Sequence, residues 1–123
     1  MTNKVIVTGV GGRSVGAGIL FALGTLQSRY TVISTDADPF SFGLYKAEYG
    51  YVIPKAGASD YCDVLNGIIK THNVQAIFPG TIPEVEYLAK NREKIKAPLI
   101  MNLNASLVDI AADKLLVYHH LKK

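Results

Sequence analysis

Short apolar runs alternate along this sequence with segments whose apolar side chains recur at helical spacing. The short runs predict buried strands of a parallel sheet, and the recurring positions predict helices that cover it. The predicted strands are residues 4–8, 30–35, 49–53, 75–78 and 98–101. Helical spacing is found at residues 19–26, 61–69 and 85–89, with shorter stretches at 42–46, 106–110 and 113–123.

Strands that alternate with helices indicate an α/β fold, because neighbouring parallel strands need a crossover between them. We expect a mainly parallel sheet of about five strands with helices on both faces. The first and fourth strands should be neighbours where the winding reverses, and ligands of such sheets bind at the carboxyl ends of the strands near that point. The segments that fall there are residues 9–18, Asp36 and residues 79–84.

Polar residues mark the expected helix ends. Ser59 or Asp60 is placed to cap the helix that ends near residues 72 and 73. Thr81 is placed to cap the next helix, with Pro83 in its first turn and Glu84 at the capping-box position. Asn102 or Asn104 is expected to lead into the helical stretch at residues 106–110, and Asp113 is expected to begin the last one.

The glycine loop after the first strand is the strongest local signal. Such glycines either bring backbone amides to an anion at a helix N-terminus or allow close packing of strand and helix, and both readings stay open. Gly9 and Gly11 fit the first two positions of the dinucleotide fingerprint, but position 14 is serine. Gly16 and Gly18 come three positions too late for the loop of short-chain dehydrogenases. The spacing therefore argues against a dinucleotide.

A nicotinamide-dependent reductase is nevertheless an alternative. Asp36 ends the second strand, where such an enzyme has a carboxylate that binds the ribose of its cofactor. The same residue also suits an Asx turn. Tyr118 and Lys122, with Ser106 upstream, imitate the serine, tyrosine and lysine spacing of short-chain dehydrogenases. Because the matching glycine loop is missing, we interpret that spacing as coincidence and the Asp36 position as a turn.

Composition narrows the class of protein. The chain has 123 residues, of which 49% are hydrophobic, and carries a net charge of +3, which fits one domain. Its single cysteine, Cys62, cannot form an internal disulfide, so the cytoplasm is the expected compartment. No apolar stretch is long enough for a membrane span, and no arginine-rich stripe predicts nucleic-acid binding. His119 and His120 are adjacent and point apart on a helix, so no metal site is predicted.

Several segments, taken together, resemble the N-terminal domain that precedes the catalytic module of ATP-grasp ligases, especially those like the carbamoyl-phosphate synthase large subunit. The segments that carry the resemblance are residues 5–13, 32–36, 51–55, 76–84 and 112–116. The resemblance implies a Rossmann-like three-layer sandwich that helps to hold a carboxylate or amine substrate, while ATP is bound by later subdomains.

The resemblance also suggests roles for particular residues. Arg13, with Gly11 and Gly12 beside it, is the candidate for a substrate carboxylate or phosphate, and Glu84 is the candidate for orienting an amine. Lys114 is the candidate contact to ATP phosphate. Each also has a plain structural reading: solvent exposure for Arg13 and Lys114, and helix capping for Glu84. No catalytic residue is assigned, because the family's magnesium ligands and second ATP lysine are not found here.

The expected organisation is a pre-ATP-grasp domain over residues 1–111 and the start of a truncated ATP-grasp module over residues 112–123. The last helix carries no glycine or proline stop, which agrees with a cut chain. ATP and magnesium would act only in the full-length parent, so the isolated chain should be inactive and bind neither tightly. Candidate partners are the rest of the enzyme, a small carboxylate or amine substrate and a second copy of the chain. A stand-alone, non-catalytic binding module is the remaining alternative.

Overall fold

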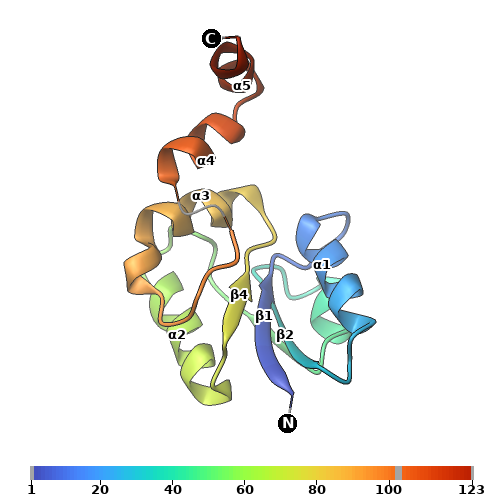
Figure 1. Ribbon diagram of the computed structural model, residues 1–123. Coiled ribbons are helices and arrows are strands. Elements are labelled where there is room, and N and C mark those ends of the chain that lie inside the picture. The colour runs from blue at the N-terminus through green and yellow to red at the C-terminus, as the bar shows by residue number, and fades with distance from the viewer. Residues whose placement is uncertain (1, 102–103, 123) are drawn as a thin grey trace.

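One parallel sheet with helices on both faces organises the residues that this computed structural model describes, 2–101 and 104–122 (Figure 1). The strand order is β3-β2-β1-β4, so the first and fourth strands are neighbours, as predicted. The elements, in chain order, are β1 (Asn3–Thr8), α1 (Val15–Gly24), β2 (Tyr30–Asp36), η1 (Phe42–Tyr45), β3 (Tyr49–Val52), α2 (Tyr61–His72), β4 (Ala76–Phe78), α3 (Ile82–Asn91), η2 (Arg92–Lys94), α4 (Ala105–Ala111) and α5 (Lys114–Leu121).

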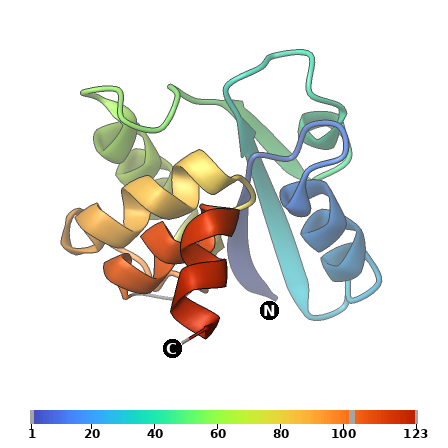
Figure 2. The same ribbon diagram turned by 90° about the horizontal axis from the view of Figure 1, so that it is seen from above.

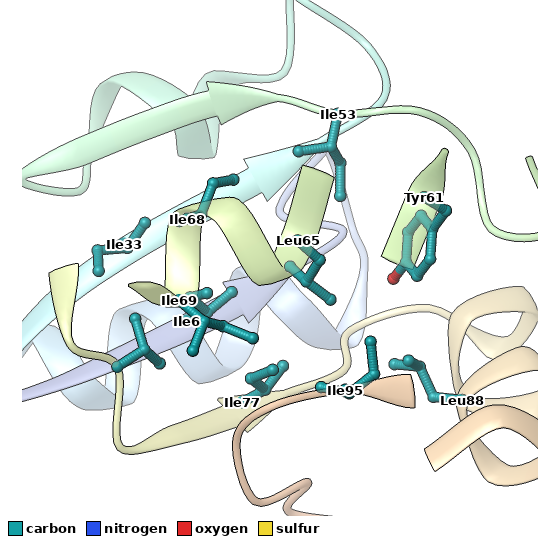
Figure 3. Packing of buried hydrophobic residues seen from close by; sticks show 11 residues of the cluster. Ile6, Ile33, Ile53, Tyr61, Leu65, Ile68, Ile69, Ile77, Leu88 and Ile95 are labelled. Carbon is teal, nitrogen blue, oxygen red and sulfur yellow. The ribbon is translucent and has the colours of Figure 1, made fainter. Parts of the chain in front are cut away.

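The two faces of the sheet bury separate apolar clusters. Alternation along β1 sends Val5 and Val7 toward α1 and η1, and sends Ile6 toward α2 and α3. Figure 2, which looks down on the molecule, shows α1 on one side of the strands and α2 with α3 on the other. The cluster on the α2 side includes Ile6, Ile33, Leu65, Ile77 and Leu88 (Figure 3). The predicted Rossmann-like three-layer α/β fold is confirmed.

The fifth predicted strand forms only a single bridge. Leu99 pairs with Ile77, whose N–H donates to Pro98 and whose carbonyl accepts from Ile100. The next donor on β4's side would be the N–H of residue 79, and proline has none, so the ladder cannot continue. The sheet therefore has four strands and a one-residue bridge.

The helix caps predicted at Thr81, Asn104 and Asp113 form. Thr81 caps α3 by accepting the Glu84 N–H, and Asn104 caps α4 by accepting the Leu107 N–H at 3.2 Å. Asp113 caps α5 through two amides. Asp60 precedes α2 but makes no side-chain cap bond, because its backbone, at φ −101° and ψ 1°, lacks the extended conformation of an N-cap. At the other end of α2, Asn73 adopts the left-handed region at φ 54°. Asn102 lies outside the described residues.

The last two helices stand apart from the sheet. α4 packs on α3, and α5 packs on α4, beyond the edge to which the strands point (Figure 1). α5 buries none of its side chains. Within the described ranges, no helix is long and apolar enough to cross a membrane. The division of the chain at residue 111 stays a prediction.

Two glycines allow three backbone segments to meet where β1 ends. A Cβ on Gly16 would lie 2.4 Å from the carbonyl oxygen of Thr8, and one on Gly80 would lie 2.0 Å from the same atom. The Gly16 N–H also donates to the Gly80 carbonyl at 3.2 Å. Part of the glycine loop therefore serves close packing, which was one of its two sequence readings.

Gly16→Ala should destabilise the fold by roughly 3 kcal/mol, since its Cβ would press on backbone that cannot move aside. Gly18→Ala, in the same helix, is the matched control: no atom lies within 4 Å of its Cβ position, so alanine should gain up to about 1 kcal/mol of helix propensity. Urea unfolding of both variants measures the difference. Equal stabilities would show that the Gly16 contact carries no constraint.

Candidate functional site

A cleft of about 410 Å³ opens at the carboxyl ends of β1, β2 and β3, against the start of α3. Its walls include Gly9, Asp36, Lys55 and Glu84. A second groove, about 340 Å³, lies between the end of α1 and the start of β2, away from the edge where such sheets bind ligands. The cleft at the strand ends is therefore the candidate site.

Glu84 is the buried charge of this cleft. Its side chain is only 7% exposed, and both carboxylate oxygens accept hydrogen bonds. The Tyr61 hydroxyl donates to Oε2 at 2.7 Å, and the Thr81 hydroxyl donates to Oε1 at 2.9 Å. Tyr61 is fully buried and lies at one end of the apolar cluster, near Leu88 (Figure 3). The carboxylate is thus fixed from two elements, α2 and the start of α3.

Burial raises the pKa of the Glu84 carboxyl above its ordinary value of 4.5. Hydrogen bonds from Tyr61, Thr81 and Thr8 act in the opposite direction, and the negative charge of Asp36 adds to the increase. Burial, assisted by the charge of Glu84, also raises the pKa of the Tyr61 hydroxyl. Tyr61 therefore keeps its proton and remains a donor to the carboxylate.

The glycine loop approaches this cleft at its first residues. Gly9 adopts φ +62°, and a Cβ there would lie 2.2 Å from Cγ2 of Thr81 and 2.9 Å from Oε1 of Glu84. A side chain at position 9 would therefore displace the carboxylate. Gly11 lies beside Asp36 and Ser41. Gly12 is exposed at φ +56°, with no atom within 4 Å of its Cβ position.

The amides at the start of α1 already have partners within the chain. Gly16 donates to Gly80, and Ala17 donates to the Ser14 side chain at 3.1 Å. Ser14 in turn donates to the Gly9 carbonyl at 2.6 Å. A dinucleotide pyrophosphate binds to amides at this position, so these bonds weigh against the reductase alternative.

The other predicted site residues lie outside the walls of the cleft. Arg13 is exposed in the loop before α1, and Lys114 is exposed as the first residue of α5. Neither forms an ion pair with any residue in the described part of the chain. The structure therefore brings Glu84 to the cleft, with Gly11 close by, and leaves Arg13 and Lys114 on the surface.

Three contributors to the site were not predicted from the sequence. Tyr61 reads as an ordinary apolar position of α2, Thr8 as an ordinary strand residue, and Lys55 only as part of the family resemblance. The one available signal was that a tyrosine in a buried helical position needs a partner for its hydroxyl. Among residues 2–101 and 104–122, no group of three histidine, cysteine or acidic side chains could hold a metal ion.

Residues 5–102 match the family model for the PylC-like N-terminal domain. The chain belongs to this family. No curated protein sequence matches it. The prediction that it is the N-terminal, Rossmann-like domain of an ATP-grasp type of enzyme is confirmed at family level. A specific likeness to carbamoyl-phosphate synthase stays a prediction.

Solved structures show the same fold at low sequence identity. N5-carboxyaminoimidazole ribonucleotide synthetase from Thermotoga maritima matches with a TM-score of 0.65 and 17% identity over 98% of this chain and 30% of that one. The biotin carboxylase domain of a thermophilic 2-oxoglutarate carboxylase gives 0.63 and 16%, over 99% and 28%. The dTDP-glucose 4,6-dehydratase of Bacillus anthracis gives 0.52 and 21%, over 80% and 37%. This PylC-like domain thus spans about a third of each protein.

Tyr61→Phe should destabilise the PylC-like domain by about 2 kcal/mol, because a buried carboxylate loses a donor. The matched control is Tyr87→Phe. In the described part of the chain that hydroxyl meets only the Cys62 sulfur, at 3.6 Å, and its loss should change stability by less than about 0.5 kcal/mol. Chemical denaturation measures both. Similar losses in the two variants would contradict a special role for the Tyr61 bond.

The raised Glu84 pKa predicts a pH dependence of stability. Glu84 is protonated more easily in the folded than in the unfolded protein. The stability that Glu84 contributes is therefore complete below its pKa in the unfolded state and is lost as pH rises through its pKa in the folded state. Each unit of difference is about 1.4 kcal/mol. Relative to Glu84→Gln, the wild-type free energy of unfolding should fall as pH increases through this window. Parallel pH profiles would rule out the shift.

Proposed function

We propose that this chain is the substrate-holding N-terminal domain of an ATP-dependent ligase that joins a carboxylate to an amine. In this proposal Glu84 binds the amine as its ammonium ion. The observation that carries the proposal is a carboxylate, 7% exposed, fixed on the wall of a cleft at the carboxyl ends of the strands. Family membership supports it.

The contacts of Glu84 orient its charge but do not neutralise it. Tyr61, Thr81 and Thr8 donate through neutral hydroxyl groups, and a carboxylate has about four acceptor positions. Acceptor capacity is therefore left for a ligand at the cleft wall. A ligand ammonium would supply both the missing donor and the missing positive charge, and Asp36 on the same cleft adds to its attraction.

ATP, in this proposal, is held by the rest of the enzyme. The first amides of α1 are bonded within the chain, so they offer no cradle for a triphosphate. Lys114 is exposed at the start of α5 and fits a contact to a nucleotide phosphate, while exposed Arg13 fits a substrate carboxylate or phosphate. In the parent, ATP would activate the carboxylate as an acyl phosphate. The isolated domain would bind substrate weakly and not turn over, and we place the enzyme in the cytoplasm.

An NMR titration of the chain with ethylammonium chloride tests the amine site. Amide shifts should move at Gly9, Thr81 and Glu84, and sodium propionate of the same concentration should leave them in place. Affinity for ethylammonium should rise as pH increases through the raised Glu84 pKa, because only the carboxylate attracts the cation.

Glu84→Gln should abolish the ethylammonium response while keeping the fold. Glu86→Gln is the matched control, because it removes the same charge from α3 at a side chain that lines a different groove, against α4. Equal binding by the wild type and Glu84→Gln, or a stronger response to propionate than to ethylammonium, would overturn the proposal.

A further inference from the structure

β3 is an edge strand, with β2 on one side and no strand of the described residues on the other. Directly after the strand, Ile53 donates its N–H to the Asp36 carbonyl of β2. Because the backbone groups of a strand alternate in direction, the N–H and carbonyl groups of Gly50 and Val52 point away from β2. No residue in the ranges 2–101 and 104–122 forms a hydrogen bond with these outward groups.

This edge is open, although both faces of β3 are covered. On one face the Tyr51 hydroxyl is hydrogen-bonded to Nε2 of His72, in α2, at 2.6 Å. On the other face, a Cβ on Gly50 would lie 2.1 Å from the Leu44 carbonyl oxygen of η1. Gly50 is exposed, and Val52 is 54% exposed. Edge strands are often protected by a lysine, a proline or a bulge, and none of these is found within the four residues of β3.

The outward groups of β3 are complementary to those of a second β3 that runs antiparallel to it. In such a pair, two residues that lie directly opposite exchange both of their N–H to carbonyl bonds, and this happens at every second position. With Gly50 of one copy opposite Val52 of the other, every outward N–H and carbonyl group of both strands gains a partner. Tyr51 then lies opposite itself on a two-fold axis. A two-fold contact of this kind is closed, so it stops at a dimer.

The charges beside β3 favour the same arrangement. Glu48 precedes the strand and Lys55 follows it; both are exposed, and neither forms an ion pair within the described ranges. Antiparallel pairing of two copies brings the start of one strand beside the end of the other, so each Glu48 lies near Lys55 of the second copy. Lys46 is two residues farther from the strand. A parallel pairing would instead place Glu48 beside Glu48.

We propose that this chain forms a two-fold dimer by antiparallel pairing of β3 with β3 of a second copy, which joins the two sheets into one. Gly50 lies opposite Val52, and Tyr51 lies at the two-fold axis. Because the strand has only four residues, the contact is small, and the expected Kd is on the order of 0.1 mM. The proposal does not depend on amine binding by Glu84.

Sedimentation velocity at protein concentrations from about 10 µM to about 1 mM tests the dimer. The wild type should change from monomer to dimer across this range. Val52→Pro removes one outward N–H and should stay monomeric, with its fold kept because proline is tolerated where an edge N–H faces solvent. Val52→Thr keeps the N–H and a β-branched side chain, so this matched control should dimerise like the wild type.

Glu48→Lys and Lys55→Glu test the antiparallel arrangement. Either variant alone places like charges at both ends of the paired strands, so its Kd should increase roughly tenfold. In an equal mixture of the two variants, one chain carries lysine at both positions and the other carries glutamate at both. The mixture should therefore form a heterodimer about as tight as the wild-type dimer.

A wild type that stays monomeric throughout would overturn the proposal, and so would a dimer that Val52→Pro leaves intact. Loss of the dimer in Val52→Thr as well as in Val52→Pro would contradict the role of the backbone N–H. A mixture of the two charge variants that associates no better than either alone would overturn the antiparallel arrangement. A monomeric wild type whose Gly50 and Val52 amide NMR signals shift only with an unrelated extended peptide would assign the edge to another protein.

Hydrogen exchange decides the question if Val52→Pro does not fold. In the wild type, the Gly50 and Val52 amides should exchange more slowly as the protein concentration rises, because each becomes hydrogen-bonded only in the dimer. Exchange of these amides at the same rate at all concentrations would overturn the proposal.

Discussion

The position of the candidate site follows from one backbone contact, the approach of Gly16 and Gly80 to the end of β1. In an open α/β sheet the crevice between the first and fourth strands is the usual place for a ligand. Here the Gly16 N–H donates to the Gly80 carbonyl, and neither residue leaves room for a Cβ beside Thr8. That part of the crevice is filled by backbone. The remaining cleft extends instead over the ends of β2 and β3.

The same contact places the buried charge. Gly80 leads directly into Thr81, which caps α3 and donates to Glu84 in its first turn. Tyr61 donates to the other carboxylate oxygen from α2, so the charge joins the two helices that cover one face of the sheet. A carboxylate that only capped a helix would turn toward water; Glu84 is buried because Tyr61 holds it. The structural and the ligand-binding readings of Glu84 are therefore compatible.

The sequence predicted what depends on neighbours along the chain. β-branched runs mark the strands, and Thr81 and Asn104 cap helices through bonds that span three residues. The sequence did not predict contacts between distant segments. Tyr61 and Glu84, which are hydrogen-bonded, are separated by 23 residues, and Gly80 and Thr8 by 72. The fifth predicted strand forms only a one-residue bridge, because its partner β4 is followed by Pro79. The apolar pattern of one strand does not show what its partner can donate. The Asx turn predicted at Asp36 depends on a residue two positions away, and it forms: Asp36 Oδ1 accepts the Asp38 N–H.

The cleft gathers more negative than positive charge, and this follows from how its walls are built. Asp36 is the last residue of β2, and Glu84 lies in the first turn of α3, so each is placed by a local hydrogen bond made for structural reasons. Burial raises the pKa of Glu84, and the negative charge of Asp36 adds to that increase. Lys55, which is exposed, also lines the cleft. A cation bound between them would relieve a cost that the fold imposes whether or not ligand is present. In the proposed function, the preference of the cleft for a positively charged group would thus follow from the turn and the cap themselves.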